Sequence, residues 1–272
     1  MGASRKSTTA RPTVLDAERI AKQLARDHQK RPALRIEQEV DSTNTHLARL
    51  RAAGETVEVL LAESQSAGRG RRGRHWISPP GAGVYLSMFR AFAGPVRRLE
   101  ALGLVAGLAG AVAIERCCGV RAGLKWPNDV QIDGRKVAGC LIDLGGVPGA
   151  AQAIIGIGIN VDFGGWTGPD QPWTDLASAT GQAPDRHRLA ATLIDQLTDD
   201  LNRFDAHGFG ELQGQWAIRD VLSGREVVAC GPRNTSVQGR VLGVDESGRL
   251  LLQTPDELQR LHGGEVTLNI SR

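Results

Sequence analysis

Seven consecutive residues, 68–74, read Gly-Arg-Gly-Arg-Arg-Gly-Arg and place four guanidinium groups among three glycines. Glycine lets backbone N–H groups approach an anion closely, and arginine supplies planar, permanently charged forks that match phosphate or carboxylate. Residues 57–62, which predict a short apolar strand, precede this segment, and the proline- and glycine-rich residues 79–83 break the chain after it. The pattern therefore predicts a loop that wraps a small, dense anion.

Three other interpretations of this loop compete. Gly68, Gly70 and Gly73 satisfy the Gly-x-Gly-x-x-Gly pattern of dinucleotide-binding folds, but Pro79 and Pro80 stand where the helix of that motif should begin. The net charge of only +3 and the lack of interleaved aromatic residues argue against an arginine-rich nucleic-acid segment. A plain solvated basic loop stays open if the loop is taken alone.

A second segment, Lys125-Trp126-Pro127-Asn128-Asp129, narrows the choice. Proline fixes the backbone and disfavours helix for the preceding Trp126. Asn128 and Asp129 are then expected to open a strand, with side chains that can face a pocket. A simple entry into a strand would need neither the lysine nor the tryptophan.

A third segment predicts a hairpin. Residues 130–132 and 136–144 flank an Asp-Gly pair, which is a strong signal for a tight turn between two strands. Lys136 begins the second strand, and the alternation of a strand puts the small residues Ala138 and Cys140 on its face, so its amine has room to point into a cavity. For a single lysine at the edge of a hairpin, exposure to solvent is the alternative.

Residues 153–161 predict a continuous apolar strand whose two faces differ. Isoleucine and valine fill one face, whereas Gly156, Gly158 and Asn160 lie on the other. Two glycines on one face leave room for a ligand or for another backbone.

The spacing of apolar residues divides the chain into a part with helices and an all-β C-terminal part. Residues 13–25, 101–114 and 186–204 repeat apolar side chains at helical spacing, whereas residues 225–270 read as short strands and turns, typical of a small all-β barrel. The predicted organisation is an N-terminal tail with a short helix at 1–33, a main domain at 34–222 and a C-terminal all-β domain at 223–272.

The composition is that of an ordinary soluble protein, with 272 residues, 41% hydrophobic and 23% charged. The four cysteines form no metal or disulfide pattern, which favours thiols in a reducing cytosol. The first twelve residues lack the apolar core of a signal peptide, and the apolar run 101–114 is too short to span a membrane. A cytoplasmic location without a membrane partner is expected.

Together these segments resemble the catalytic domain of biotin protein ligases (biotin–acetyl-CoA-carboxylase ligases) over about residues 40–161, and more weakly to the C-terminus. The resembling blocks are residues 41–44, 62–71, 84–88, 125–129, 135–139 and 155–161. The resemblance implies an α+β fold similar to the catalytic core of class II aminoacyl-tRNA synthetases, a mixed sheet flanked by helices, followed by an SH3-like β-barrel.

The resemblance also implies a reaction in two steps. Biotin and ATP, with Mg²⁺ carried by the nucleotide, give biotinyl-5′-AMP and pyrophosphate, and a lysine of a biotin carboxyl carrier domain then takes the biotin and releases AMP. Some members of the family carry an N-terminal DNA-binding domain, but fewer than forty residues precede the resembling region here. DNA binding is therefore not expected, and a homodimer stays open.

Site residues follow from the matching positions. The resemblance assigns biotin binding to Ser42, Thr43, Asn44, Gln65, Arg69, Gly70, Arg71 and Lys136, and ATP or adenylate binding to Arg71, Arg74, Trp76, Asn128 and Asn160. The expected catalytic residues are Arg69, Arg71, Lys136 and Asp129. The cations neutralise the carboxylate and phosphates that must meet, Trp76 stacks on adenine, and Asp129 orients or deprotonates the carrier lysine.

Two other functions stay open at this point. A lipoate or octanoate ligase or transferase has a related fold, and pocket specificity is a difference of affinities that a sequence shows poorly. A non-enzymatic nucleic-acid binder would use the arginine loop and the basic N-terminal tail. Residues 163–174, rich in glycine, proline and tryptophan, align with nothing in the family and are expected to form either an adenine-side loop or a surface loop.

Overall fold

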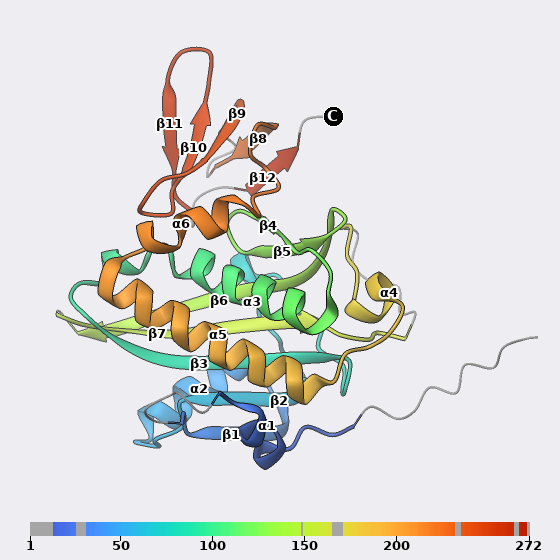
Figure 1. Ribbon diagram of the computed structural model, residues 1–272. Helices are drawn as coiled ribbons and strands as arrows, with labels where there is room; N and C mark the ends of the chain where they lie inside the picture. The colour runs from blue at the N-terminus through green and yellow to red at the C-terminus, as the bar shows by residue number, and fades with distance from the viewer. Residues whose placement is uncertain are drawn as a thin grey trace, which may run out of the picture.

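The computed structural model describes residues 13–25, 31–147, 149–164, 171–231, 235–263 and 267–270. Within these residues a seven-stranded sheet forms the centre, with the order β1-β2-β3-β7-β6-β5-β4 (Figure 1). Its strands are β1 Leu34–Val40, β2 Val59–Gln65, β3 Gly83–Ala93, β4 Gly123–Lys125, β5 Asp129–Ile132, β6 Arg135–Val147 and β7 Ala150–Asn160. Strands β1 and β2 are parallel and the other neighbours are antiparallel, which confirms the predicted mixed sheet.

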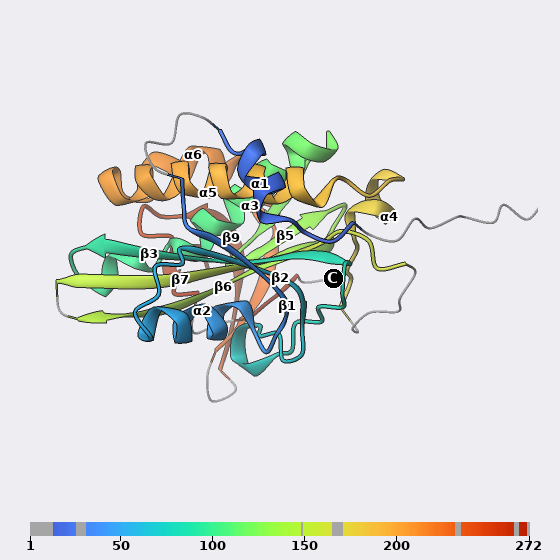
Figure 2. The ribbon, with the colours of Figure 1, turned by 90° about the horizontal axis from the view of Figure 1, so that it is seen from below.

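Helices cover the two faces of this sheet unequally. The helices are α1 Ala17–Gln23, α2 Thr43–Ala52, α3 Leu102–Cys118, α4 Leu176–Thr180, α5 Arg186–His207 and α6 Gly210–Ala217, with short 3₁₀ turns η1 Arg71–Gly73 and η2 Val96–Leu99. Figure 2 shows α1, α3 and α5 on one face and α2 on the opposite face. The face that carries α2 is therefore the less covered one.

Helix α3 is the centre of the hydrophobic core. It packs against α5 and against strands β6 and β7, and it ends where Gly119 adopts the left-handed conformation, with φ 68°. Residues 96–118 are long and apolar enough to cross a membrane by length and composition alone, but most of this window is buried inside the protein. The buried helix predicted over residues 101–114 is confirmed and is one turn longer.

The second sheet has five antiparallel strands in the order β11-β10-β9-β8-β12. They are β8 Glu226–Cys230, β9 Ser236–Val244, β10 Leu250–Gln253, β11 Leu258–Leu261 and β12 Thr267–Ile270, so the all-β character expected for the C-terminal part is confirmed. The buried Trp126 joins this sheet to the main one, because its Nε1 donates a hydrogen bond to the Gly248 carbonyl over 3.0 Å.

The N-terminal segment is attached to the main sheet by buried charges. Arg186 at the start of α5 pairs with Glu63 of β2 over 2.8 Å, and its Nε donates to the Gly83 carbonyl over 3.1 Å. The other oxygen of Glu63 accepts from the Leu15 backbone N–H, and Arg186 also reaches the Thr13 carbonyl. The ends of β2 and β3 are thus fixed to α5 and to the segment that leads into α1.

Candidate active site

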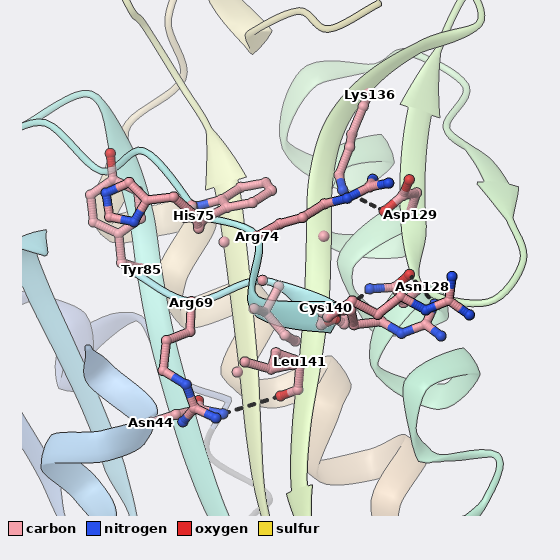
Figure 3. A pocket seen from close by; sticks show the side chains of 18 of the residues that line it. Asn44, Arg69, Arg74, His75, Tyr85, Asn128, Asp129, Lys136, Cys140 and Leu141 are labelled. Atoms are coloured by element: carbon pink, nitrogen blue, oxygen red, sulfur yellow. Dashed lines mark hydrogen bonds and ion pairs between the residues drawn. The ribbon is translucent and has the colours of Figure 1, made fainter. Parts of the chain in front are cut away.

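A cavity of about 430 Å³ opens on the face of the sheet that carries α2 (Figure 3). Its volume is typical of sites for small ligands. The start of α2, the end of β2, the arginine loop, the β4–β5 turn and the central part of β6 and β7 all contribute to its walls. The predicted site residues that line it are Ser42, Thr43, Asn44, Gln65, Arg69, Gly70, Arg71, Arg74, Trp76, Asn128, Asp129 and Lys136.

One end of the cavity is a neutral polar wall. Gln65 Oε1 accepts from the Thr43 backbone N–H over 2.8 Å and from Thr43 Oγ1 over 3.2 Å. The amide nitrogen of Gln65 donates to Ser78 Oγ over 2.7 Å. These bonds fix the orientation of the Gln65 amide. Ser42 is buried beside them as the N-cap of α2, and its side chain makes no capping hydrogen bond to the helix.

Asn44 extends this wall toward β6 and β7. Its Oδ1 accepts from Ser87 Oγ over 2.6 Å, and its Nδ2 donates to the Leu141 carbonyl over 3.3 Å and to Asp143 Oδ2 over 3.1 Å. A Cβ atom at Gly156 would lie 2.3 Å from Asn44 Oδ1. Glycine is therefore required at position 156 for Asn44 to lie flat on the strand.

The arginine segment is a loop, as predicted, and contains the 3₁₀ turn η1. The Gly70 N–H donates to the Arg74 carbonyl over 2.7 Å, and His75 Nδ1 lies 2.9 Å from the Gly68 carbonyl. Arg72 adopts the left-handed conformation, with φ 58°, which is uncommon for residues other than glycine. The loop folds back on itself, so its guanidinium groups spread toward different walls of the cavity.

Three cations in the cavity contact protein oxygens. Arg69 pairs with Asp143 over 3.0 Å, Arg71 Nη1 donates to Asn128 Oδ1 over 3.2 Å, and Lys136 Nζ lies 2.5 Å from Asp129 Oδ1. Figure 3 shows Lys136 and Asp129 at the end of the cavity opposite Asn44. The cations therefore occupy the space between the polar wall and the β4–β5 turn.

Burial lowers the pKa of the Arg71 guanidinium; the neighbouring charges of Arg72 and Arg74 act in the same direction, and Asp129 opposes them. An anion that enters the cavity stabilises this cluster of like charges. In the same wall, burial raises the pKa of the Cys140 thiol to about 12, with Asp129 raising it further and Lys136 opposing. Cys140 is thus a neutral thiol at physiological pH and does not supply a nucleophile.

Lys136 lies on a different face of β6 from the one that its sequence position suggested. The pairing of β5 with β6 shifts register between Val130 and Gln131, a β-bulge, so regular alternation fails there. A Cβ atom at Gly139 would lie 3.2 Å from Lys136 Nζ, which places the amine over Gly139. The expectation that Lys136 shares its face with Ala138 and Cys140 was wrong, although its amine does line the cavity.

Trp76 covers the glycine face of β7. A Cβ atom at Gly158 would lie 2.5 Å from Trp76 Nε1, and Lys136 Nζ lies 5.2 Å from the centroid of the indole ring. The indole N–H is buried and has no hydrogen-bond acceptor among the described residues. The room that the two glycines leave is thus filled by Trp76 and Asn44, and the open face of the indole borders the cavity.

Asn160 is the one expected site residue that the structure does not bring into the cavity wall. It is buried, and its Nδ2 donates to the Thr174 carbonyl over 3.0 Å. Of the segment 163–174, residues 165–170 lie outside the described part; Gln171 and Pro172 line the cavity, and the Pro172 carbonyl accepts from the Lys136 backbone N–H over 3.0 Å.

Sequence reasoning missed several wall residues. Lys125, His75 and Tyr85 line the cavity without an assigned role, and Asp143 contacts Arg69 beside it. Tyr85 is buried and its hydroxyl donates to the Pro79 carbonyl over 3.1 Å. Lys125 and Tyr85 belong to the resembling blocks 125–129 and 84–88, so their position was a usable signal, whereas His75 lies just outside the arginine segment. Nothing in the local pattern marked Asp143, because its partner is distant in the sequence.

Comparison with known proteins identifies the class of this fold and site. Residues 37–160 match the model of the biotin/lipoate A/B protein ligase family, and residues 222–268 match the biotin protein ligase C-terminal domain. The chain is 33% identical to the biotin–[acetyl-CoA-carboxylase] ligase of Paracoccus denitrificans, over 83% of this chain and 96% of that protein. The chain belongs to the biotin protein ligase family.

Two further proteins show how far the likeness extends. The bifunctional ligase/repressor BirA of Escherichia coli (strain K12) is 37% identical over 84% of this chain and 72% of its own length. The structure of the biotin protein ligase from Aquifex aeolicus in complex with biotin and ATP superposes with a TM-score of 0.75 at 31% identity, covering 88% of this chain and 99% of that one. Both sheets are therefore part of the shared architecture.

Proposed function

We propose that this protein joins biotin to ATP, as MgATP, to form biotinyl-5′-AMP, and then transfers the biotinyl group to a lysine of a biotin carboxyl carrier domain of the acetyl-CoA carboxylase type. The observation that carries the proposal is the convergence of Arg69, Arg71 and Lys136 on one cavity that ends in a neutral polar wall. An acid with a neutral polar head and a carboxylate tail fits such a cavity, and its carboxylate would meet the cations.

The polar wall binds the uncharged end of biotin. The cyclic urea of biotin has one carbonyl oxygen and two N–H groups, so it needs both donors and acceptors. Thr43, Gln65 and Asn44 offer both kinds of group at fixed orientation, and the buried hydroxyl of Ser42 adds another. A site built from oriented polar groups rejects acids that lack matching groups, because its own donors and acceptors would stay unpaired.

The three cations assist the first step. The carboxylate oxygen of biotin attacks the α-phosphorus of ATP, the bond to the β-phosphate breaks, and pyrophosphate leaves with the electron pair. Arg69 and Lys136 bring the carboxylate close to the phosphates, and Arg71, with Gly70 and Arg74 beside it, stabilises the charge that develops on them. Donors fixed in advance in this way contribute a few kcal/mol each, on the order of 2–4.

Trp76, Asn128 and the arginine loop bind and enclose the nucleotide. The indole of Trp76 offers a flat surface for adenine, and Asn128 orients Arg71. Asn160 supports this end indirectly, through the Thr174 segment that it binds. Closure of the arginine loop over the adenylate excludes water, which would otherwise hydrolyse the mixed anhydride.

Asp129 serves the second step. The amine of the carrier lysine must lose a proton before it can attack the carbonyl carbon of the adenylate, and AMP then leaves with the bonding electrons. Asp129 lies 2.5 Å from Lys136, so it is close to the group that binds the acyl phosphate. We assign it to orient the incoming amine and to accept its proton.

We also propose the division of the chain. Residues 34–222 form the catalytic domain and residues 223–272 a C-terminal SH3-like domain, with residues 1–33 as an N-terminal tail and short helix. The two sheets and the two family matches support these boundaries. A cytoplasmic location, where ATP is available, agrees with cysteines that form no disulfide among the described residues. DNA binding and dimer formation are not needed for the reaction.

The test is ATP–pyrophosphate exchange with biotin, lipoate and octanoate offered separately. We expect exchange that depends on biotin and not on the other two acids. Exchange with lipoate or octanoate instead would move the protein to the related class that shares its family model. Absence of exchange with all three acids, together with salt-dependent binding of DNA or RNA, would favour the nucleic-acid binder.

A further inference from the structure

Asp143 is a half-buried carboxylate on β6, and it has no role in the two reaction steps proposed above. It accepts from Arg69 Nη1 over 3.0 Å and from Arg69 Nη2 over 3.3 Å, a geometry that orients the guanidinium plane. Its Oδ2 also accepts from Asn44 Nδ2 over 3.1 Å. One carboxylate thus contacts both the arginine loop and the polar wall of the cavity.

The position of Asp143 is fixed from the core outward. Ser87 is fully buried and donates to Asn44 over 2.6 Å. Gly156 leaves the room in which Asn44 Oδ1 lies, since a Cβ atom at this position would be 2.3 Å from that oxygen. A continuous series of hydrogen bonds therefore runs from Ser87 through Asn44 and Asp143 to Arg69.

Other contacts of Arg69 are weak by comparison. Thr45 Oγ1 lies 3.4 Å from Arg69 Nη1, which is long for a hydrogen bond. Among the described residues Asp143 is the carboxylate within ion-pair distance of Arg69. A guanidinium has five N–H donors, so the two that bind Asp143 leave others for a substrate carboxylate.

We propose that Asp143 is a positioning residue. It orients the guanidinium of Arg69 toward the carboxylate of biotin, and it links this orientation to the position of Asn44 in the polar wall. The inference rests on the proposed function. Arg71 and Lys136 have their own partners, Asn128 and Asp129, so loss of Asp143 affects the biotin side of the reaction and leaves the nucleotide side unchanged.

The first experiment measures steady-state ATP–pyrophosphate exchange for Asp143→Ala. The KM for biotin rises about three- to tenfold, as expected for the loss of one partly exposed pair that orients a substrate contact, and the KM for ATP stays within twofold. Glu226→Ala is the matched control, because it removes an exposed carboxylate from Arg240 on the second sheet at a similar distance, 3.3 Å. Its KM values equal those of the unmodified protein.

A double-mutant cycle separates positioning from general stability. If Asp143 acts through Arg69, the variant with both Arg69→Ala and Asp143→Ala has the same KM for biotin as Arg69→Ala alone. Asp143→Asn keeps one oxygen for Arg69, so it gives a KM between those of the unmodified protein and Asp143→Ala. The thermal midpoints of the single variants are measured alongside, and they stay within two degrees of the unmodified protein.

Different experimental results would overturn the positioning role of Asp143 and the proposed ligase function. Biotin-dependent exchange in the unmodified protein with an unchanged KM in Asp143→Ala would overturn the positioning role and leave the ligase intact. Additive effects in the double variant, or equal increases in both KM values, would also overturn it. Absence of biotin-dependent exchange in the unmodified protein would instead remove the proposed function on which the inference rests.

Discussion

At the scale of single residues, the cations of the cavity differ in their surroundings. Arg69 is exposed and pairs with a carboxylate, and Arg71 is half-buried and donates to the amide oxygen of Asn128. Lys136 lies between Asp129 and the indole of Trp76. Lys136 is thus the cation that both an acyl phosphate and Asp129 can contact. This gives it the largest expected share in catalysis.

Replacement of Lys136 tests this assignment. Lys136→Met keeps the length of the side chain and removes the charge, so the rate of biotin-dependent exchange at saturation falls about 100- to 1000-fold. Lys22→Met, which removes an exposed lysine of α1, leaves the rate unchanged. A loss of less than threefold in Lys136→Met would show that the reaction proceeds without this amine.

The packing of Trp76 on β7 gives a second residue-scale prediction. Gly158→Ala inserts a methyl group that would lie 2.5 Å from the indole nitrogen, so the ring must shift. Because base stacking on an aromatic ring contributes about 1–3 kcal/mol, the KM for ATP rises about tenfold while the KM for biotin changes little. Gly145→Ala on β6, where nothing lies within 4 Å of the new atom, is the control. Equal effects of the two variants would contradict the stacking role of Trp76.

At the scale of elements, much of the framework was predictable from hydrophobic periodicity. The strands β2, β5 and β7 and the helices α3 and α5 begin or end close to the residues that their patterns indicate. The two-faced character of β7 was also predicted correctly. The β-bulge near Lys136 was missed, because a register shift depends on the partner strand and leaves no mark in the alternation of one strand.

The buried pair between Glu63 and Arg186 gives an element-scale prediction. It joins β2, β3, α5 and the N-terminal segment, and the Arg186 side chain is only 6% exposed. Arg186→Ala leaves the Glu63 carboxylate buried without its partner, so the free energy of unfolding falls by about 3–5 kcal/mol, measured by denaturant titration. Arg240→Ala, which breaks an exposed pair, lowers it by about 0–1 kcal/mol.

The double replacement supplies a further check on this pair. Glu63→Gln combined with Arg186→Met removes both charges, so it regains a large part of the stability that Arg186→Ala loses. If the double variant were as unstable as Arg186→Ala, packing and not the unpaired charge would explain the loss.

At the scale of the whole molecule, the sequence predicted two units but not how they meet. Trp126 lies in a motif that pointed to the site, yet its indole is buried and binds the Gly248 carbonyl of the second sheet. Gly248 also fits closely against Ala101 and Leu104 at the start of α3. Contacts between segments so distant in the chain have no local signature. The same reason explains why the pair of Arg69 with Asp143 was not predicted.

The pH dependence of global stability follows from a buried acid on α5. Burial raises the pKa of Asp200 above its ordinary value of 3.8, while Gln196 and Arg203 oppose this shift. Well below its ordinary pKa of 3.8 the carboxyl of Asp200 is protonated in the folded and unfolded states alike. As the pH rises, the unfolded chain releases this proton first, so the contribution of Asp200 to stability is lost between its ordinary pKa and its higher folded pKa.

Asp200→Asn therefore gains stability relative to the unmodified protein as the pH rises. The difference in Tm, variant minus unmodified, increases by about 2–4 °C between pH 4 and pH 8. Asp41→Asn gives the opposite trend, because the hydrogen bond from Arg49 lowers the pKa of Asp41, and its stabilising contribution is lost as the pH falls. A difference for Asp200→Asn that does not change with pH would contradict the assignment of a raised pKa.

The central claim is that one cavity forms an adenylate, protects it from water and gives it to a carrier lysine. The most direct measurement is a single-turnover experiment with α-labelled ATP, excess protein and biotin, in which a biotin carrier domain is added after a delay. The account predicts that the label stays with the protein as biotinyl-5′-AMP until the carrier is added, and that AMP then appears together with biotin on one carrier lysine. Release of AMP at the same rate with and without the carrier would contradict it.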